Sequence, residues 1–277
     1  MLTLSLGFSP CPNDTFIFDA LVNQKIELPN INLELVIADV AELNRLAFEG
    51  KLDVTKISYH ALGHVLPKYE LLKTGSALGN NCGPLLIAKR FLNEEEIKNA
   101  TIAIPGQFTT ANFLLSLAFP QIKHKKEMLF SEIEQAVLNN EVDAGLIIHE
   151  NRFTYEEKGL LKIIDLGEFW ETLTNLPIPL GGIAIKRSLA SETKKTFENL
   201  LRKSIEMAFE QPQNTLNYVK KHAQEMNEKV MMQHIGLYVN QYSIDLGEKG
   251  ERAIETLFDM AQKKSIIPPF NGNVLLQ

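Results

Sequence analysis

The sequence has little of what marks exported, membrane-spanning or nucleic-acid-binding proteins. Its 277 residues include two cysteines, Cys11 and Cys82, too few for a disulfide framework or a cysteine-based zinc site. No unbroken apolar run approaches the roughly 18 residues of a membrane-spanning helix, and the first residues lack the basic and apolar regions of a signal peptide. The formal net charge of -6 makes nucleic acid an unexpected partner, and 45% hydrophobic residues exclude a disordered chain. We expect a globular cytoplasmic protein with no membrane or nucleic-acid partner.

The sequence also lacks the glycine-rich motifs that bind nucleotide phosphates. Neither GxxxxGK[ST] nor GxGxxG occurs, which argues against ATP hydrolysis and nicotinamide redox chemistry. His60 and His64 stand at helical spacing and could share a metal ion, but the glutamate of the zinc-protease motif is absent between them. An ordinary surface pair explains these histidines better, and we expect no metal site.

Strand-like and helix-like patterns alternate along the first two-thirds of the chain. This order predicts βαβ units, a mostly parallel sheet and the α/β class. We expect strands at residues 2–6, 31–38, 54–58, 69–72, 84–88, 101–104 and 144–149, and helices at 15–22, 39–50, 59–66 and 109–118, with a further helix capped by Ser131 and Glu134. From Lys186 the pattern changes to amphipathic helices at 192–209, 214–224, 229–240 and 248–264, expected to cover the first lobe.

Two pairs of segments suggest that the two halves share one topology. Leu4-Ser-Leu-Gly-Phe-Ser, followed by a helix, parallels Ile102-Ala-Ile-Pro-Gly-Gln, and Asp53 and Asp143 precede matching strands. The segment Leu176-Pro-Ile-Pro-Leu-Gly-Gly is rich in residues that interrupt regular structure and is the natural crossing point between lobes. We therefore expect residues 1–88 and 180–277 to form a larger discontinuous lobe, and residues 89–179 a smaller inserted lobe.

Ligands of such sheets bind at the carboxyl ends of the strands, which makes His149 the most informative residue. It ends the apolar run Leu146-Ile-Ile, and an unperturbed imidazole pKa near 6.5 suits proton abstraction around neutrality. A histidine that is merely hydrogen-bonded at a strand end is the alternative. His149 is the candidate general base.

Three further segments supply polar groups to the same strand ends. Thr109 and Thr110 follow Gly106 at a helix start, where hydroxyl and backbone N–H groups can hold a carboxylate, although ordinary N-capping explains them equally. In the loop from Ser9, either Asn13 or Asp14 is a ligand contact or a helix cap. Lys56 and Ser58 alternate with Ile57 on a strand; burying that lysine is costly unless a buried partner or an anionic ligand satisfies it.

Four stretches of sequence resemble one known family. They are Gly7-Phe-Ser-Pro-Cys-Pro-Asn-Asp-Thr-Phe-Ile-Phe18, Lys56-Ile-Ser58, Thr109-Thr110 and Gly145-Leu-Ile-Ile-His-Glu-Asn-Arg-Phe-Thr-Tyr155. Together they resemble the 1,4-dihydroxy-6-naphthoate synthases of the futalosine route to menaquinone, and the likeness runs essentially from end to end. The resemblance implies a two-lobed fold like the type II periplasmic binding proteins, with a cleft between the lobes.

The resemblance also implies a reaction and its residues. The substrate would be the small carboxylate cyclic dehypoxanthine futalosine, converted without a metal ion or organic cofactor. His149 matches the family's proton acceptor, and Lys56, Ile57, Ser58, Thr109 and Thr110 match its substrate-binding segments. Ser9 and Asn13 are further candidates for substrate binding, on the basis of their position alone. A related chorismate dehydratase and a non-catalytic solute-binding protein remain the alternatives, and the sequence leaves the oligomeric state open.

Overall fold

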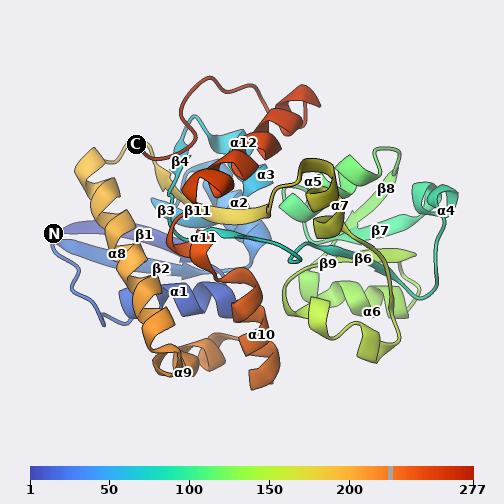
Figure 1. The fold of residues 1–277 in the computed structure, drawn as a ribbon, viewed down its shortest axis with the longest axis horizontal. Coiled ribbons are helices and arrows are strands. Elements are labelled where there is room, and N and C mark those ends of the chain that lie inside the picture. The colour runs from blue at the N-terminus through green and yellow to red at the C-terminus, as the bar shows by residue number, and fades with distance from the viewer. Residues whose placement is uncertain (224–226) are drawn as a thin grey trace. The chain divides into compact units, whose positions relative to one another are not determined.

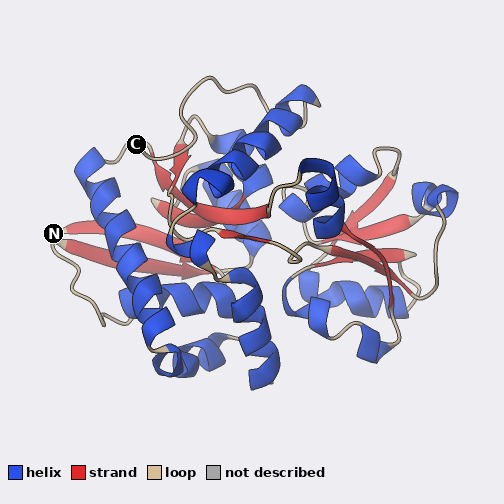
Figure 2. Cartoon of the chain, viewed as in Figure 1, coloured by secondary structure: helices blue, strands red, loops and turns tan. Residues whose placement is uncertain are grey.

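The computed structural model describes residues 1–223 and 227–277 and divides into two compact units. Unit 1 contains Met1–Gly79 and Pro179–Gln277, and unit 2 contains Asn80–Ile178. The chain can be followed from one unit into the other and back in Figure 1, and Figure 2 shows helices beside the strands of each unit. Unit 1 is therefore discontinuous in sequence, and unit 2 is inserted into it.

The sheet of unit 1 is mixed, with strand order β2-β1-β3-β11-β4 and β5 paired to β11. These strands are β1 (Leu2–Phe8), β2 (Ile31–Ile37), β3 (Val54–Ser58), β4 (Tyr69–Leu71), β5 (Ala77–Gly79) and β11 (Ile178–Lys186). β1 is parallel to β2 and β3, whereas β11 is antiparallel to β3 and β4. The prediction of a mostly parallel sheet is wrong, because the chain segment that returns from unit 2 forms β11, which is antiparallel to its neighbours.

Helices from both ends of the chain complete unit 1. They are α1 (Pro12–Val22), α2 (Val40–Glu49), α3 (Tyr59–Val65), α8 (Ser191–Glu210), α9 (Pro212–His222), α10 (Glu228–Tyr238), α11 (Gln241–Ile244) and α12 (Gly247–Lys263). α8, α9 and α10 all pack against α1, so the late helices cover unit 1 as predicted. Their apolar faces join the core of β1 and α1, which includes Phe18, Phe197 and Leu201. The predicted end of one helix at Gln224 lies outside the described residues.

Unit 2 contains a second mixed sheet, of order β10-β6-β9-β7-β8. Its elements are β6 (Leu85–Ala88), α4 (Glu94–Asn99), β7 (Thr101–Ile104), α5 (Thr110–Ala118), β8 (His124–Glu127), η1 (Phe130–Glu132), α6 (Ile133–Leu138), β9 (Ala144–Ile147), η2 (His149–Phe153), η3 (Glu156–Lys158), β10 (Leu161–Asp165) and α7 (Leu166–Thr174). The expected cap at Ser131 is wrong: a short 3-10 helix occupies that position, and Glu132 precedes α6.

The first boundary between the units differs from the expected one. Residues 80–88 were expected in the larger lobe, but they lie in unit 2. The reason is that β6 is hydrogen-bonded on both sides within that unit, antiparallel to β9 and to β10. The chain thus changes unit just before this strand.

The two units share one local arrangement, which we call a corner: the aspartate that precedes one strand is hydrogen-bonded to the backbone of a neighbouring strand. The Asp53 carboxylate accepts from Ser5 N at 3.0 Å, and the Asp143 carboxylate accepts from Thr101 N at 2.7 Å. In both units the aspartate N–H donates in turn to the carbonyl of the same strand residue. Strand pairing places Leu6 opposite Val54 and Ile102 opposite Ala144. The correspondence is real, but Leu6 rather than Leu4 is the counterpart of Ile102.

Among the residues that the structure describes, no helix is both long and apolar enough to cross a membrane.

Candidate active site

Unit 1 holds a buried polar group that we call the Asp14 cluster, made of Ser9, Asn13, Asp14 and Lys56. Ser9 follows β1, Asn13 and Asp14 occupy the first turn of α1, and Lys56 lies within β3. Pro12 at the start of α1 fixes the backbone where the helix begins. The four residues are between 1% and 7% exposed. The strand-to-helix turn and the neighbouring strand thus bring an ion pair out of water.

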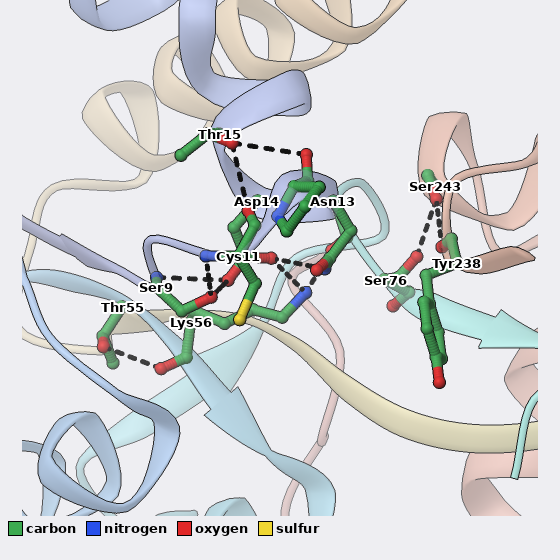
Figure 3. Close-up of polar contacts among 12 residues, drawn as sticks. Ser9, Cys11, Asn13, Asp14, Thr15, Thr55, Lys56, Ser76, Tyr238 and Ser243 are labelled. Atoms are coloured by element: carbon green, nitrogen blue, oxygen red, sulfur yellow. Dashed lines mark hydrogen bonds and ion pairs between the residues drawn. The ribbon is translucent and has the colours of Figure 1, made fainter. Parts of the chain in front are cut away.

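The Asp14 carboxylate is the centre of this cluster (Figure 3). One oxygen, Oδ1, lies 3.1 Å from Lys56 Nζ and accepts from Asn13 Nδ2 at 2.8 Å. The other, Oδ2, accepts from Ser9 Oγ at 2.7 Å and from Ser9 N at 3.2 Å. A buried ion pair repays its desolvation only when further hydrogen bonds satisfy both charges, and the carboxylate meets that condition.

The cluster settles two questions that the sequence leaves open. Lys56 is satisfied by a buried partner, Asp14, and the Lys56 ammonium also donates to Gly75 O at 3.5 Å. Neither Asn13 nor Asp14 caps α1, because the N-cap is Cys11, whose carbonyl accepts from Asp14 N. The sequence did not identify Asp14 as the common partner of Ser9, Asn13 and Lys56. The signal that pointed to such a partner was that Lys56 was predicted to be buried.

The other predicted residues of β3 have separate surroundings. Ser58 N donates to Asn44 Oδ1 at 3.0 Å, and Ser58 Oγ accepts from Asn44 Nδ2 at 3.1 Å. Asn44 lies on α2 and is only 3% exposed, and nothing local to its sequence marks it. Ile57 is fully buried. Next along the chain, burial raises the pKa of Tyr59 far above its ordinary value, and its hydroxyl is hydrogen-bonded to Ser76 Oγ at 2.6 Å.

In unit 2, Thr109 and Thr110 form the start of α5. Thr109 is the N-cap: its hydroxyl accepts from Asn112 N at 3.2 Å and donates to Gly106 O at 2.8 Å. Both threonines are buried. Lys125 Nζ donates to Asn112 Oδ1 at 2.8 Å, and burial lowers the pKa of that lysine. The capping interpretation is therefore correct for Thr109, and a cation lies beside the same helical turn.

His149 begins η2 one residue after the end of β9, with a backbone φ of 58°. This left-handed conformation is unfavourable for residues other than glycine, with asparagine and histidine among the better tolerated. The half-buried imidazole packs edge-on against Phe130, with ring centroids 5.1 Å apart. The next residues are fixed: Asn151 Nδ2 donates to the buried carboxylate of Glu134 at 2.5 Å, and Arg152 pairs with Asp165 at 2.7 Å. His149 therefore lies in a constrained turn at a strand end.

The two histidines considered for a metal site are not a surface pair, and that expectation is wrong. His60 is 6% exposed, and its ring centroid lies 5.4 Å from that of His64. They are covered because α3 packs into unit 1, and burial lowers the pKa of His64. In the described part of the chain, no group of three or more histidine, cysteine or acidic residues is arranged to hold a metal ion.

Comparison with known proteins identifies the family. A model described as menaquinone biosynthesis matches residues 4–263. The chain belongs to this menaquinone biosynthesis family. It is 45% identical over 97% of both chains to a protein from Thermus thermophilus, and 41% identical over 99% of this chain and 98% of the other to one from Streptomyces coelicolor. Both relatives are named 1,4-dihydroxy-6-naphthoate synthase.

Solved structures place this family member in the periplasmic-binding-protein fold, as predicted. A crystal structure of a protein from Archaeoglobus fulgidus is similar with a TM-score of 0.91 and 36% identity, covering 96% of this chain and 98% of the other. A Candida albicans protein described as having the generic periplasmic binding protein fold matches with a TM-score of 0.69 at 12% identity, covering 98% and 92%. The second likeness concerns the fold alone.

Proposed function

We propose that this chain is a 1,4-dihydroxy-6-naphthoate synthase. The observation that carries the proposal is the pair of relatives with that name, which are 45% and 41% identical to it over nearly their whole lengths. The segments on which the resemblance rests also form ordered local structures, namely the Asp14 cluster, the start of α5 and the constrained turn at His149. We propose that the enzyme works in the cytoplasm on a small carboxylate substrate, with no metal ion or organic cofactor.

The substrate proposed from the resemblance is cyclic dehypoxanthine futalosine. His149 would remove a hydroxyl proton from it in a retro-aldol-like step. The freed O–H electron pair would form the carbonyl group of the departing sugar-derived fragment, and the electron pair of the broken carbon–carbon bond would become an enolate of the remaining ring. Aromatisation of the remaining ring supplies the driving force. The constrained backbone of His149 supports this role, since a general base must be held within hydrogen-bond reach of the proton that it abstracts.

We propose substrate-binding roles for residues of each unit. The start of α5 offers backbone N–H groups and the positive end of a helix dipole to the substrate carboxylate, and Thr110 lies in its first turn. In unit 1, Ser58 together with Asn13 or Ser9 would bind sugar hydroxyl groups, and Ile57 belongs to the same substrate-binding segment. The Lys56 ammonium has three N–H groups, and in the described residues only Asp14 and Gly75 accept from it, which leaves one for a ligand.

The test is incubation of the purified chain with cyclic dehypoxanthine futalosine, and separately with chorismate, followed by detection of the naphthoate product by its absorbance. Naphthoate from the first substrate supports the proposal. Turnover of chorismate instead would indicate the dehydratase, and binding without turnover would indicate a solute-binding protein.

The role of His149 is tested by His149→Asn, because asparagine tolerates the left-handed backbone of this position. We expect a folded variant that binds substrate and turns it over about 10²-fold more slowly, as for loss of a general base. His124→Asn, at an exposed position of β8, is the matched control. Turnover by His149→Asn within about threefold of the parent would show that His149 is not the general base.

A further inference from the structure

His234 is a fully buried histidine far along the chain to which the proposed reaction gives no role. It lies on α10 and is 0% exposed. Its Nε2 atom lies 2.8 Å from Oδ1 of Asn13, on the first turn of α1, and its ring packs against Tyr238 with centroids 4.7 Å apart. The histidine therefore touches the Asp14 cluster from outside.

The hydrogen bonds of Asn13 have only one consistent direction. Asp14 is paired with Lys56, and an ionised carboxylate only accepts hydrogen bonds, so the Asn13 group that faces Asp14 must be the donating amide nitrogen. The amide oxygen of Asn13 then faces His234, and it can only accept. It follows that Nε2 of His234 carries a hydrogen.

We propose that His234 is a positioning residue for Lys56. Its Nε2–H fixes the amide of Asn13, the Asn13 amide fixes one oxygen of Asp14, and that oxygen holds the Lys56 ammonium. Figure 3 shows the side chains of Asn13, Asp14 and Lys56 turned toward one another, with hydrogen bonds converging on the carboxylate. A helix from the second half of unit 1 thereby fixes a group on β3. This inference rests on the proposed function, in which Lys56 binds substrate.

The first experiment needs no variant. Long-range ¹H–¹⁵N NMR spectra of the full chain labelled at histidine nitrogens report which ring nitrogen of His234 is protonated, once the resonance is assigned with His234→Gln. We expect a hydrogen on Nε2. A neutral ring with its hydrogen on Nδ1 and bare Nε2 would overturn the proposal, because that tautomer cannot donate to Asn13. This measurement does not depend on the substrate.

The second experiment is a double-mutant cycle measured by steady-state kinetics on the futalosine-derived substrate. Lys56→Met is expected to raise KM by about tenfold or more with a small change in kcat, as for a group that binds substrate and transition state alike. His234→Phe, which removes the donor, is expected to raise KM by at least about fivefold. His234→Gln keeps an N–H donor and is expected to recover most of that loss.

The double variant decides between positioning and a merely structural role. If His234 acts through Lys56, then His234→Phe with Lys56→Met has the KM of Lys56→Met alone. Multiplication of the two single effects, or a wild-type KM in His234→Phe, would overturn the proposal. His222→Phe, the same exchange at a partly exposed position of α9, is the control and should leave KM unchanged.

The outcomes also separate this inference from the proposed function. If the wild-type chain does not turn the substrate over, the proposed function fails, and the NMR measurement still tests the contact with Asn13. If Lys56→Met binds substrate as the parent does, the role of Lys56 fails and His234 has nothing to position. If Lys56→Met raises KM but the cycle is additive, only the inference about His234 fails.

Discussion

At the residue scale, His149 combines an unfavourable backbone with firm anchors on its C-terminal side. A positive φ outside glycine persists only where the surroundings enforce it. Here the enforcing contacts are the hydrogen bond of Asn151 to Glu134 and the contacts of Arg152 with Gly83 O and Asp165. Glu134 is 3% exposed, and burial would penalise its charge, but the ion pair with Lys158 at 2.6 Å and the hydrogen bond from Asn151 stabilise it.

Asn151→Ala removes the anchor next to His149. We expect stability to fall by about 1–3 kcal/mol, because a buried carboxylate loses a hydrogen-bond donor. We expect kcat to fall by about tenfold or more with little change in KM, because misplacement of a reacting group lowers the rate of the chemical step. Urea unfolding and steady-state kinetics measure the two effects.

The matched control is Asn139→Ala, an exposed asparagine just after α6. It should change neither quantity. A destabilised Asn151→Ala enzyme that keeps the kcat of the parent would show that this anchor serves folding alone.

At the element scale, the corner at Asp53 joins β1 to β3. The pKa of Asp53 is lowered: burial alone would raise it, but the bonds from Ser5 and Lys186 more than offset that effect. A carboxyl group with a depressed pKa stabilises the folded state above its ordinary pKa of about 3.8, and this contribution is lost as the pH falls through the folded-state value. The stabilisation that the Asp53 corner gives to the fold is therefore expected to decrease at acid pH.

Asp53→Asn should reveal that sensitivity. At pH 7 we expect the variant to be about 1–2 kcal/mol less stable than the parent, because a partly exposed carboxylate with three donor contacts is lost. The difference should shrink as the pH falls below about 4, where the carboxyl group of the unfolded parent takes up a proton, and should be lost as the pH passes below the lower folded-state pKa. Urea unfolding from pH 7 to pH 2.5 measures it. A constant difference over that range would contradict the assignment, and Asp259→Asn, exposed on α12, is the control.

Much of the element order was predictable from the sequence, and the failures have physical causes. Strands Val54–Ser58 and Thr101–Ile104 match their predicted bounds. β11 was missed because Pro179, Gly181 and Gly182 resemble a loop, yet Pro179 lies before the stretch Gly181–Ile185 that pairs with β3. β8, with the sequence His-Lys-Lys-Glu, carries no apolar pattern because it is an edge strand of unit 2.

The glycines of β11 are needed for close packing. A Cβ atom on Gly181 would lie 2.8 Å from the backbone oxygen of Ile57, which cannot move without disturbing β3. We expect Gly181→Ala to lower the free energy of unfolding by about 1–3 kcal/mol, as for overpacking.

Gly236→Ala provides the opposite case for the same exchange. Apart from its chain neighbours and its own helix backbone, no described residue lies within 4 Å of an added Cβ at this exposed position of α10, so alanine should stabilise by up to about 1 kcal/mol. Urea unfolding compares the two, and equal effects would contradict the packing explanation.

At the scale of the whole molecule, the candidate site shows what a sequence pattern cannot supply. The pattern indicates that Lys56 needs a partner, but not that Asp14 is that partner or that His234, 221 positions from Asn13, touches the same cluster. These contacts depend on how α1, α10 and β3 pack, which local spacing does not encode. The unit boundary was missed for a related reason, since β6 is defined by strands that come far later in the sequence.

The boundary leads to a prediction about folding. Every strand of the unit 2 sheet, and the apolar cluster around Ile87, Ile133 and Ile147, comes from residues 80–178. We therefore expect a fragment of residues 80–178 to fold on its own and to unfold cooperatively in urea, as followed by circular dichroism. A fragment of residues 89–179 lacks β6, which separates β9 from β10 in the sheet, and should stay unfolded. If the shorter fragment folds as well as the longer one, β6 is dispensable, and the domain boundary lies where the sequence pattern first placed it.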